Sequence, residues 1–152
     1  TQARLRGNWM HSACEHYLKG INVFDDLMPS NQEMFMRVIP ILDKNITKIY
    51  GIEMPLYSGK LMTAGRADAL LEWKHHNCIL DFKTSRYPLD KEDERIVKYN
   101  LQATAYAMMA EGMYNYKFPY NILVILPGSS DDPQVVIKTN DKYRALVKRL
   151  FQ

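Results

Sequence analysis

Apolar side chains recur at helical spacing in the first part of the chain. In residues 4–19, the positions of Leu5, Trp9, Cys14, Tyr17 and Leu18 predict an amphipathic helix with one buried stripe. The polar faces of such a helix are free to carry functional groups. This segment therefore predicts a helix packed on a core, and not a linker.

A second helix is predicted from Ser30 to about Asn45. Ser30 is followed three residues later by Glu33, the pattern of a capping box, so Ser30 is the expected N-cap. Pro40 lies inside the segment and is expected to kink the helix or to end it early, because proline lacks the amide hydrogen that the helix needs.

The rest of the chain alternates between strand-like and helical patterns, without repeats or linkers. Together with the two helices, this pattern predicts a single α/β domain over residues 1–152. The expected order is two helices, three strands, a helix, two strands and a helix. The strands are expected at Lys48–Ser58, Lys60–Trp73, Cys78–Thr84, Tyr120–Leu126 and Gln134–Thr139, and the helices at Glu94–Tyr114 and Asp141–Phe151.

Polar residues interrupt the apolar hairpin formed by the second and third strands. Since side chains alternate along a strand, Asp81 and Lys83 point to the same face. A hairpin that closes around residues 74–77 brings Asp68 opposite Asp81, or within one residue pair of it. Two neighbouring carboxylates repel each other unless a cation lies between them, which predicts a divalent metal site. A surface hairpin with a cross-strand ion pair is the alternative, of equal weight.

Composition and charge narrow the classes of function only slightly. Of the 152 residues, 47% are hydrophobic and 24% charged, and the net charge of +3 permits a polyanionic partner without requiring one. The two cysteines, Cys14 and Cys78, form no CxxC motif, which argues against a cysteine-based zinc or iron–sulfur site and favours a reducing compartment. No apolar run is long enough to span a bilayer, so no membrane association is expected.

Five short motifs occur in an order that resembles the PD-(D/E)xK nuclease superfamily, and within it the RecB-like exonuclease branch. The resemblance covers residues 5–127, and within the branch it is strongest to mitochondrial genome maintenance exonucleases and related phage exonucleases. It implies a restriction-endonuclease-like core with a central mixed sheet flanked by helices. The motifs are Gly7-Asn8-Trp9-Met10-His11 with Glu15, Gly65-Arg66-Ala67-Asp68, Asp81-Phe82-Lys83, Lys83-Thr84-Ser85, and Gln102 with Tyr106.

The resemblance implies a role for each matching residue. His11, Asp68, Asp81 and the backbone carbonyl of Phe82 would hold one or two Mg²⁺ or Mn²⁺ ions. Lys83 would be the catalytic lysine. Gln102 would position Lys83 or the attacking water, and Tyr106 would brace its helix or contact the substrate. Read without the family, His11 and Tyr106 are ordinary core residues and Gln102 is a surface residue of its helix.

Two glutamates are weaker candidates. Glu53 lies on the strand before Asp68, where it would assist a second metal, and Glu15 lies one helical turn after His11, where it would orient the imidazole. For both residues an ordinary solvated glutamate is an equally good interpretation.

Basic and aromatic residues after Lys83 form a candidate DNA-binding surface. Ser85 and Arg86 are placed to hold a phosphate, while Lys98 and Tyr99 continue this character onto the following helix. A solvated helix face is the alternative, since acidic residues are interspersed with the basic ones.

The resemblance implies a metal-dependent deoxyribonuclease that acts as an exonuclease on single-stranded DNA ends. An endonuclease or resolvase of the same superfamily and a catalytically inactive nuclease-fold DNA-binding module are the alternatives. An intracellular location would follow: a bacterial or phage-infected cytoplasm, or the mitochondrial matrix.

Overall fold

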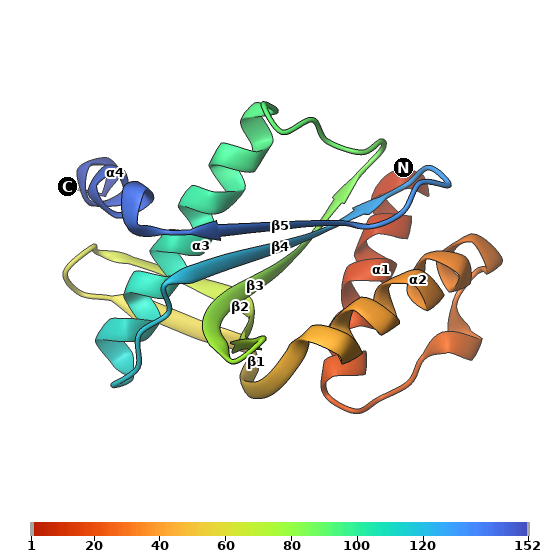
Figure 1. Ribbon diagram of the computed structural model, residues 1–152, viewed down its shortest axis with the longest axis horizontal. Coiled ribbons are helices and arrows are strands. Elements are labelled where there is room, and N and C mark those ends of the chain that lie inside the picture. Colours follow the sequence, from red (N-terminus) through yellow and green to blue (C-terminus); the bar gives the residue numbers. More distant parts are fainter. Residues whose placement is uncertain (1, 152) are drawn as a thin grey trace.

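The computed structural model describes the backbone of residues 2–151 and the side chains of residues 9–151. Five strands and four α-helices follow one another in the expected order, with one additional short 3₁₀ helix (Figure 1). Their bounds are α1 Gln2–Leu18, η1 Phe24–Asp26, α2 Pro29–Asn45, β1 Ile46–Ser58, β2 Thr63–Trp73, β3 His76–Ser85, α3 Glu94–Met113, β4 Tyr120–Pro127, β5 Gln134–Thr139 and α4 Asp141–Leu150.

The strands form one mixed sheet in the order β1-β2-β3-β4-β5. The pairs β1–β2, β2–β3 and β4–β5 are antiparallel, whereas β3 and β4 are parallel and are connected through α3. A parallel pair needs a crossover connection of this kind because its strands begin at the same end of the sheet. The predicted fold class, an α/β sheet flanked by helices, is confirmed, and this open mixed sheet is consistent with a restriction-endonuclease-like core.

Helices cover both faces of the sheet (Figure 1). On one face, α1 and α2 pack on Leu71, Leu80 and Val124. On the other face, α3 and α4 pack on Leu70 and Ile79. The two faces use alternate residues of the same strands, which explains why β3 and β4 are nearly continuous apolar runs.

The start of α2 differs from the sequence prediction. Met28 is the N-cap and Pro29 occupies the first turn, so Ser30 does not cap the helix. Proline suits this position because its fixed φ is helical and the first amides of a helix have no partner within it.

Of the two effects expected of Pro40, a kink or an early end of α2, the early end is wrong, and the predicted end at about Asn45 is confirmed. The helix continues to Asn45, with Pro40 on its exposed side. Val38 and Leu42, two residues to either side, are fully buried in the core. Their packing outweighs the one hydrogen bond that proline removes, since packing of the apolar face supplies most of the stability of a helix in a protein.

The turn between β2 and β3 is tighter than the sequence suggested. Trp73 pairs with His76, so only Lys74 and His75 form the loop, and both have positive φ (50° and 69°). A loop of two residues with positive φ suits the right-handed twist of a hairpin. The register places Ala69 opposite Leu80, and the regular pairing ends there.

The outer part of α1 also differs from expectation. Trp9 was predicted in the buried stripe but is exposed, whereas Met10 and Cys14 are buried. The side chains of Leu5, Gly7 and Asn8 lie outside the described residues. Among residues 2–151, no helix has the length and apolar character that crossing a membrane would require.

Candidate metal centre

Asp68 lies where β2 and β3 stop pairing. Its Oδ2 accepts a hydrogen bond of 2.8 Å from the backbone N–H of Phe82, so the carboxylate occupies the place of the next backbone partner in the ladder. Its Oδ1 lies 2.8 Å from Nε2 of His11 on α1. Asp68 therefore joins the sheet to α1, and the two strands diverge around its carboxylate.

Helix α1 brings a second acidic side chain to the same place. Glu15 lies one turn after His11, and its Oε2 is 3.7 Å from His11 Nε2. Glu15 is only 5% exposed, and this Oε2 is buried without a hydrogen-bond partner. The hydrogen bond with Asp68, and then the interaction with the nearby Glu15 carboxylate, raise the pKa of His11 to about 10. The protonated imidazole thus supplies the positive charge that the two carboxylates need.

Asp81 is the most deeply buried acidic side chain of this group, with 2% exposure. Burial, and then the negative charge of Asp68, raises its pKa to about 7, although Lys83 and His11 oppose the shift. Its Oδ2 has no hydrogen-bond partner. A buried carboxylate oxygen without a partner is costly, so it indicates a site shaped for something beyond the fold itself.

These donors fit a divalent cation. One ligand atom each of His11, Glu15 and Asp68 lies within 4.8 Å of the others, and Asp81 interacts electrostatically with Asp68. The unpartnered oxygens of Glu15 and Asp81 offer two further acceptors. Carboxylates with one imidazole suit Mg²⁺ and, more closely, Mn²⁺. Compared with the set expected from the sequence, the compact cluster contains Glu15 in the place of Asp81.

Lys83 extends from β3 toward α3. Its Nζ donates a 2.6 Å hydrogen bond to Oε1 of Gln102 and lies 4.9 Å from the centre of the Tyr99 ring. The lysine head is thus held by one side chain of α3 and covered by another. Tyr99 was expected only as a DNA-binding residue, and its contact with Lys83 was not foreseen.

Tyr106 packs directly on the backbone of β2. A Cβ atom added at Gly65 would lie 2.6 Å from Cε1 of the Tyr106 ring, closer than real contacts allow. Burial, and then the charges of Asp81 and Asp68, raise the pKa of the Tyr106 hydroxyl. Gly65 thus admits the tyrosine ring three residues before Asp68, and the ring packs α3 against the strand that carries this carboxylate.

Glu53 is engaged by two basic side chains. Its carboxylate accepts hydrogen bonds from Lys19 and, at 3.3 Å, from Arg66, and the hydrogen bond from Lys19 is the main cause of its lowered pKa. Glu53 also has positive φ, 53°, an uncommon backbone conformation for this residue. It does not belong to the compact group of His11, Glu15 and Asp68.

The expected DNA-binding residues follow β3 into the next loop and helix. Ser85 Oγ donates to the backbone oxygen of Tyr87 at 2.5 Å, and Arg86 lies over the Tyr87 ring at 5.7 Å. Lys98 is exposed on α3. The role of these residues in DNA binding stays a prediction. The role of the Phe82 backbone carbonyl as a metal ligand also stays a prediction.

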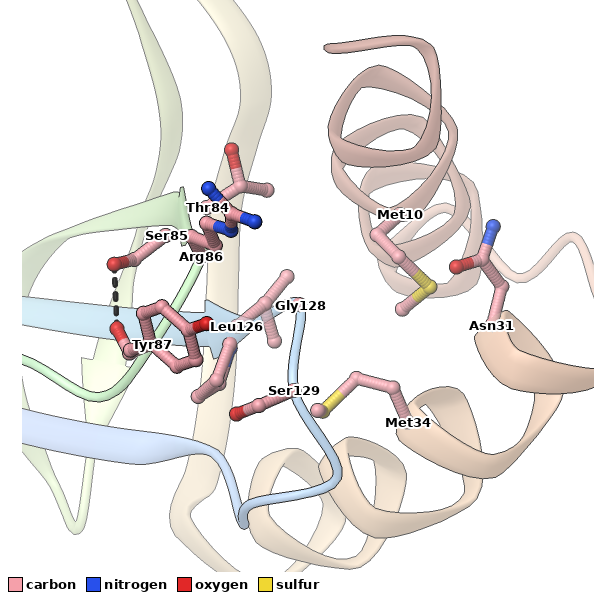
Figure 2. Close-up of a pocket in the computed structure, with 11 residues that line it drawn as sticks. Met10, Asn31, Met34, Thr84, Ser85, Arg86, Tyr87, Leu126, Gly128 and Ser129 are labelled. Atoms are coloured by element: carbon pink, nitrogen blue, oxygen red, sulfur yellow. Dashed lines mark hydrogen bonds between the residues drawn. The ribbon is translucent and has the colours of Figure 1, made fainter. Parts of the chain in front are cut away.

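Sequence reasoning missed a pocket beside this centre. It is lined from the helices by Met10, Asn31 and Met34, and from the opposite side by the end of β3 and the β4–β5 loop (Figure 2). No pattern in the sequence distinguished Asn31 from other helix-surface polar residues. Its burial depends on how α1 and α2 pack, which a single sequence does not display.

Comparisons with known proteins identify the fold. No protein-family model matches the chain, and no curated protein matches its sequence. A solved structure from Eubacterium rectale named "Putative exonuclease" is similar, with a TM-score of 0.62 and 11% identity, over 96% of this chain and 63% of that one. A second, SSO0001, has a TM-score of 0.42 and 17% identity over 81% of this chain and 58% of that one. The chain therefore shares the fold of the Eubacterium rectale protein and spans 63% of its length.

Proposed function

We propose that this protein is a metal-dependent nuclease that hydrolyses phosphodiester bonds of DNA. The observation that carries the proposal is the junction of β2 and β3. There Asp68 contacts His11 and the Phe82 amide, beside the buried Asp81, whose Oδ2 has no partner. The motif order of the PD-(D/E)xK superfamily and the fold shared with the Eubacterium rectale protein point the same way.

The acidic residues and His11 would hold the metal. Asp68, Asp81 and His11 are the ligands that the family resemblance implies, and the position of Glu15 adds it to this set. A bound Mg²⁺ or Mn²⁺ would lower the pKa of a coordinated water and offset negative charge at the scissile phosphate. Asp81 must be ionised to bind a metal. Because burial favours its protonated form, metal binding would release a proton from this side chain.

Lys83 would act beside the reacting phosphate. A lysine head held by Gln102 has one orientation and retains two further N–H groups. These would stabilise the charge that develops on the phosphate or orient the attacking water. Gln102 would then be a positioning residue, since its amide oxygen contacts Lys83.

The finer specificity follows the same branch of the family. We propose exonucleolytic action on single-stranded DNA ends, supported by the His11 helix and by the name of the Eubacterium rectale structure. An endonuclease of the same superfamily is the nearest rival, and an inactive DNA-binding module is the rival outside enzymes. Closed circular DNA distinguishes an exonuclease from an endonuclease, because an exonuclease needs a strand end to begin cleavage.

A cleavage assay tests the proposal. The substrates are end-labelled single-stranded DNA, duplex DNA and closed circles, each incubated with Mn²⁺, Mg²⁺ or EDTA. We expect degradation of linear single strands with metal, none in EDTA, and none of circles. Lys83→Ala should abolish cleavage, whereas Lys138→Ala, an exposed lysine on β5, should not. Cleavage in EDTA, or in Lys83→Ala, would contradict the proposal.

A further inference from the structure

A cavity of about 390 Å³ lies between the helices α1 and α2 and the end of β3 (Figure 2). This volume falls within the range of about 300–1,000 Å³ that is typical of small-ligand sites. The helices α1 and α2 form one wall, and the end of β3 with the β4–β5 loop forms the other. Its lining residues are Met10, Asn31, Met34, Thr84, Ser85, Arg86, Tyr87, Leu126, Pro127, Gly128 and Ser129.

The walls of this cavity are held in place by hydrogen bonds. Gly128 N–H donates to the carbonyl of Ser85 at 2.6 Å, and Ser129 N–H donates to that of Arg86 at 3.1 Å. From α2, Arg37 donates to the carbonyl of Ser130 at 2.6 Å. The β4–β5 loop is thus tied to both β3 and α2, so the cavity is formed before any ligand arrives.

Asn31 is the polar group of the cavity that the fold leaves unused. The residue is 1% exposed, and both its amide nitrogen and its amide oxygen are buried without a partner. Leaving a buried donor or acceptor unpaired lowers the stability of the fold, because the group loses its hydrogen bonds to water without gaining others. Both amide atoms have almost no accessible surface, so a ligand that presents an acceptor next to a donor would satisfy them once the flexible methionine side chains beside Asn31 move aside.

The remaining surface of the helix wall is apolar. Met10 and Met34 contribute two flexible thioethers, and Figure 2 shows both on the side of Asn31 that faces the strand wall. Leu126 lies across from them. Methionine sulfur makes favourable contacts with aromatic rings and adapts to their shape. The cavity therefore suits a flat aromatic ring with a polar edge.

The cavity and the metal centre share their elements. Met10 directly precedes His11, and Thr84 directly follows Lys83. Ser85, the last residue of β3, and Arg86, which follows it, also line the cavity. For a nucleobase in the cavity, we expect the hydroxyl and guanidinium of these two residues to interact with the phosphate attached through its sugar.

We propose that this cavity binds one unpaired nucleobase of the substrate strand, with Asn31 hydrogen-bonded to the edge of the base. The proposal rests on the proposed nuclease function and names how the substrate is held. Asparagine forms paired hydrogen bonds with base edges that carry a donor beside an acceptor. Those edges are free only in a single strand, because pairing occupies the Watson–Crick edge and stacking covers the ring faces.

Binding of single-stranded oligonucleotides in EDTA tests the proposal, because no metal-dependent cleavage occurs there. A series of fluorescent oligonucleotides, each with one abasic position, is titrated by anisotropy against the wild type, Asn31→Leu and Asn31→Ala. The control is Met36→Ala, an exposed methionine on α2 that does not line the cavity. Thermal unfolding monitors the fold, and Asn31→Leu is expected to be no less stable because it removes two unpaired atoms.

In the wild type and Met36→Ala, we expect one abasic position to weaken binding by about tenfold more than the others. Asn31→Leu and Asn31→Ala should bind the intact strand about tenfold more weakly and lose the dependence on that position. Blunt duplex should bind equally well to all variants. A folded Asn31→Leu with the position dependence of the wild type overturns the proposal. So does a wild type that shows no special position.

Two further measurements distinguish a failure of the base-pocket proposal from a failure of the proposed nuclease function. Deoxynucleoside monophosphates are titrated as competitors, and displacement by a free nucleotide without any position effect in the strand would overturn the proposal in favour of a mononucleotide site. Cleavage is measured separately with Mn²⁺. Position-dependent binding without any cleavage would contradict the nuclease function alone, whereas cleavage without position-dependent binding would contradict the base pocket alone.

Discussion

Two groups of buried polar side chains lie on this sheet, and they are built differently. At the start of β4, Asn121 donates to Asn100 and Thr104 of α3, and Asn140 donates to Asn121. Arg144 of α4 forms a two-pronged contact with Glu111, at 2.7 and 2.8 Å. At the junction of β2 and β3, by contrast, carboxylates crowd together with one imidazole and oxygens remain unpaired.

The difference separates a structural network from a functional one. Among residues 9–151, the buried side-chain atoms without a partner belong to Glu15, Asn31, Trp73 and Asp81. Three of these four residues border the candidate centre or the cavity beside it. A satisfied network stabilises the fold, whereas unpaired polar atoms are retained where a ligand completes them. Substitutions in the two groups should therefore have opposite consequences.

The largest expected effect is the loss of nuclease activity in Asp81→Asn. The amide keeps the shape of the carboxylate but not its charge, so cleavage should fall by about a hundredfold or more. The metal-free protein should be at least as stable as the wild type, because burial disfavours the charged form of Asp81. Single-turnover cleavage with Mn²⁺ and thermal melting in EDTA measure the two effects. A marked loss of stability in Asp81→Asn would mean that this residue belongs to the structural network instead.

Arg144→Met in the structural network should do the reverse. It leaves the Glu111 carboxylate, whose side chain is 10% exposed, without its main partner. We expect a loss of about 2–3 kcal/mol in the free energy of unfolding, measured by urea titration, because an unpaired charge remains largely buried. Cleavage by the folded fraction should stay unchanged. A large loss of specific activity would show that the two networks are coupled.

Gly65→Ala probes the contact that links α3 to the strand of Asp68. The added methyl group would lie 2.6 Å from the Tyr106 ring, so we expect a loss of about 1–2 kcal/mol in stability. The double variant with Tyr106→Ala should be less destabilised than the sum of the two single variants, since the clash is absent. Additive effects would show that the ring does not press on Gly65.

The smallest expected effect is a pH dependence of the stability of the protein, caused by the ionisation of Glu111. Burial raises its pKa, but the hydrogen bonds from Arg144 and Phe118 outweigh burial and hold the pKa below its usual value of 4.5. A carboxyl with a lowered pKa adds stability above that usual value and loses it as the pH falls through the folded pKa. The stability difference between the wild type and Glu111→Gln should therefore shrink below about pH 4.5. A constant difference across this range would contradict the assignment.

Much of the fold could be predicted from local patterns. The alternation in β2 and β3 predicted which face carries Lys83, and the order of all nine regular elements followed from periodicity. Met28 rather than Ser30 caps α2, Pro40 does not end this helix, Trp9 is exposed, and the loop between β2 and β3 has only two residues. Propensity rules describe an isolated helix, and here the buried neighbours of Pro40 outweighed them.

The candidate site could be predicted only as far as its motifs reach. The strand register anticipated that Asp68 and Asp81 would lie close together, and the structure places His11 against Asp68 as the resemblance implied. Glu15 was expected to orient His11, a role that stays a prediction, and it also lies in the compact cluster itself. Asn31 was missed, because its burial arises from the packing of two helices on a distant loop. Contacts between elements far apart in sequence leave no local signal.

Titration of Mn²⁺ into the metal-free protein tests the central claim most directly, namely that the unpaired carboxylate oxygens form a cation site. Calorimetry on the wild type, Asp81→Asn and Glu15→Gln, with Arg144→Met as the structural control, reports binding without any need for activity. We expect saturable binding by the wild type and Arg144→Met, and binding weaker by about tenfold or more in the other two variants. Equal affinity in all four proteins, or no binding by the wild type, would contradict the account.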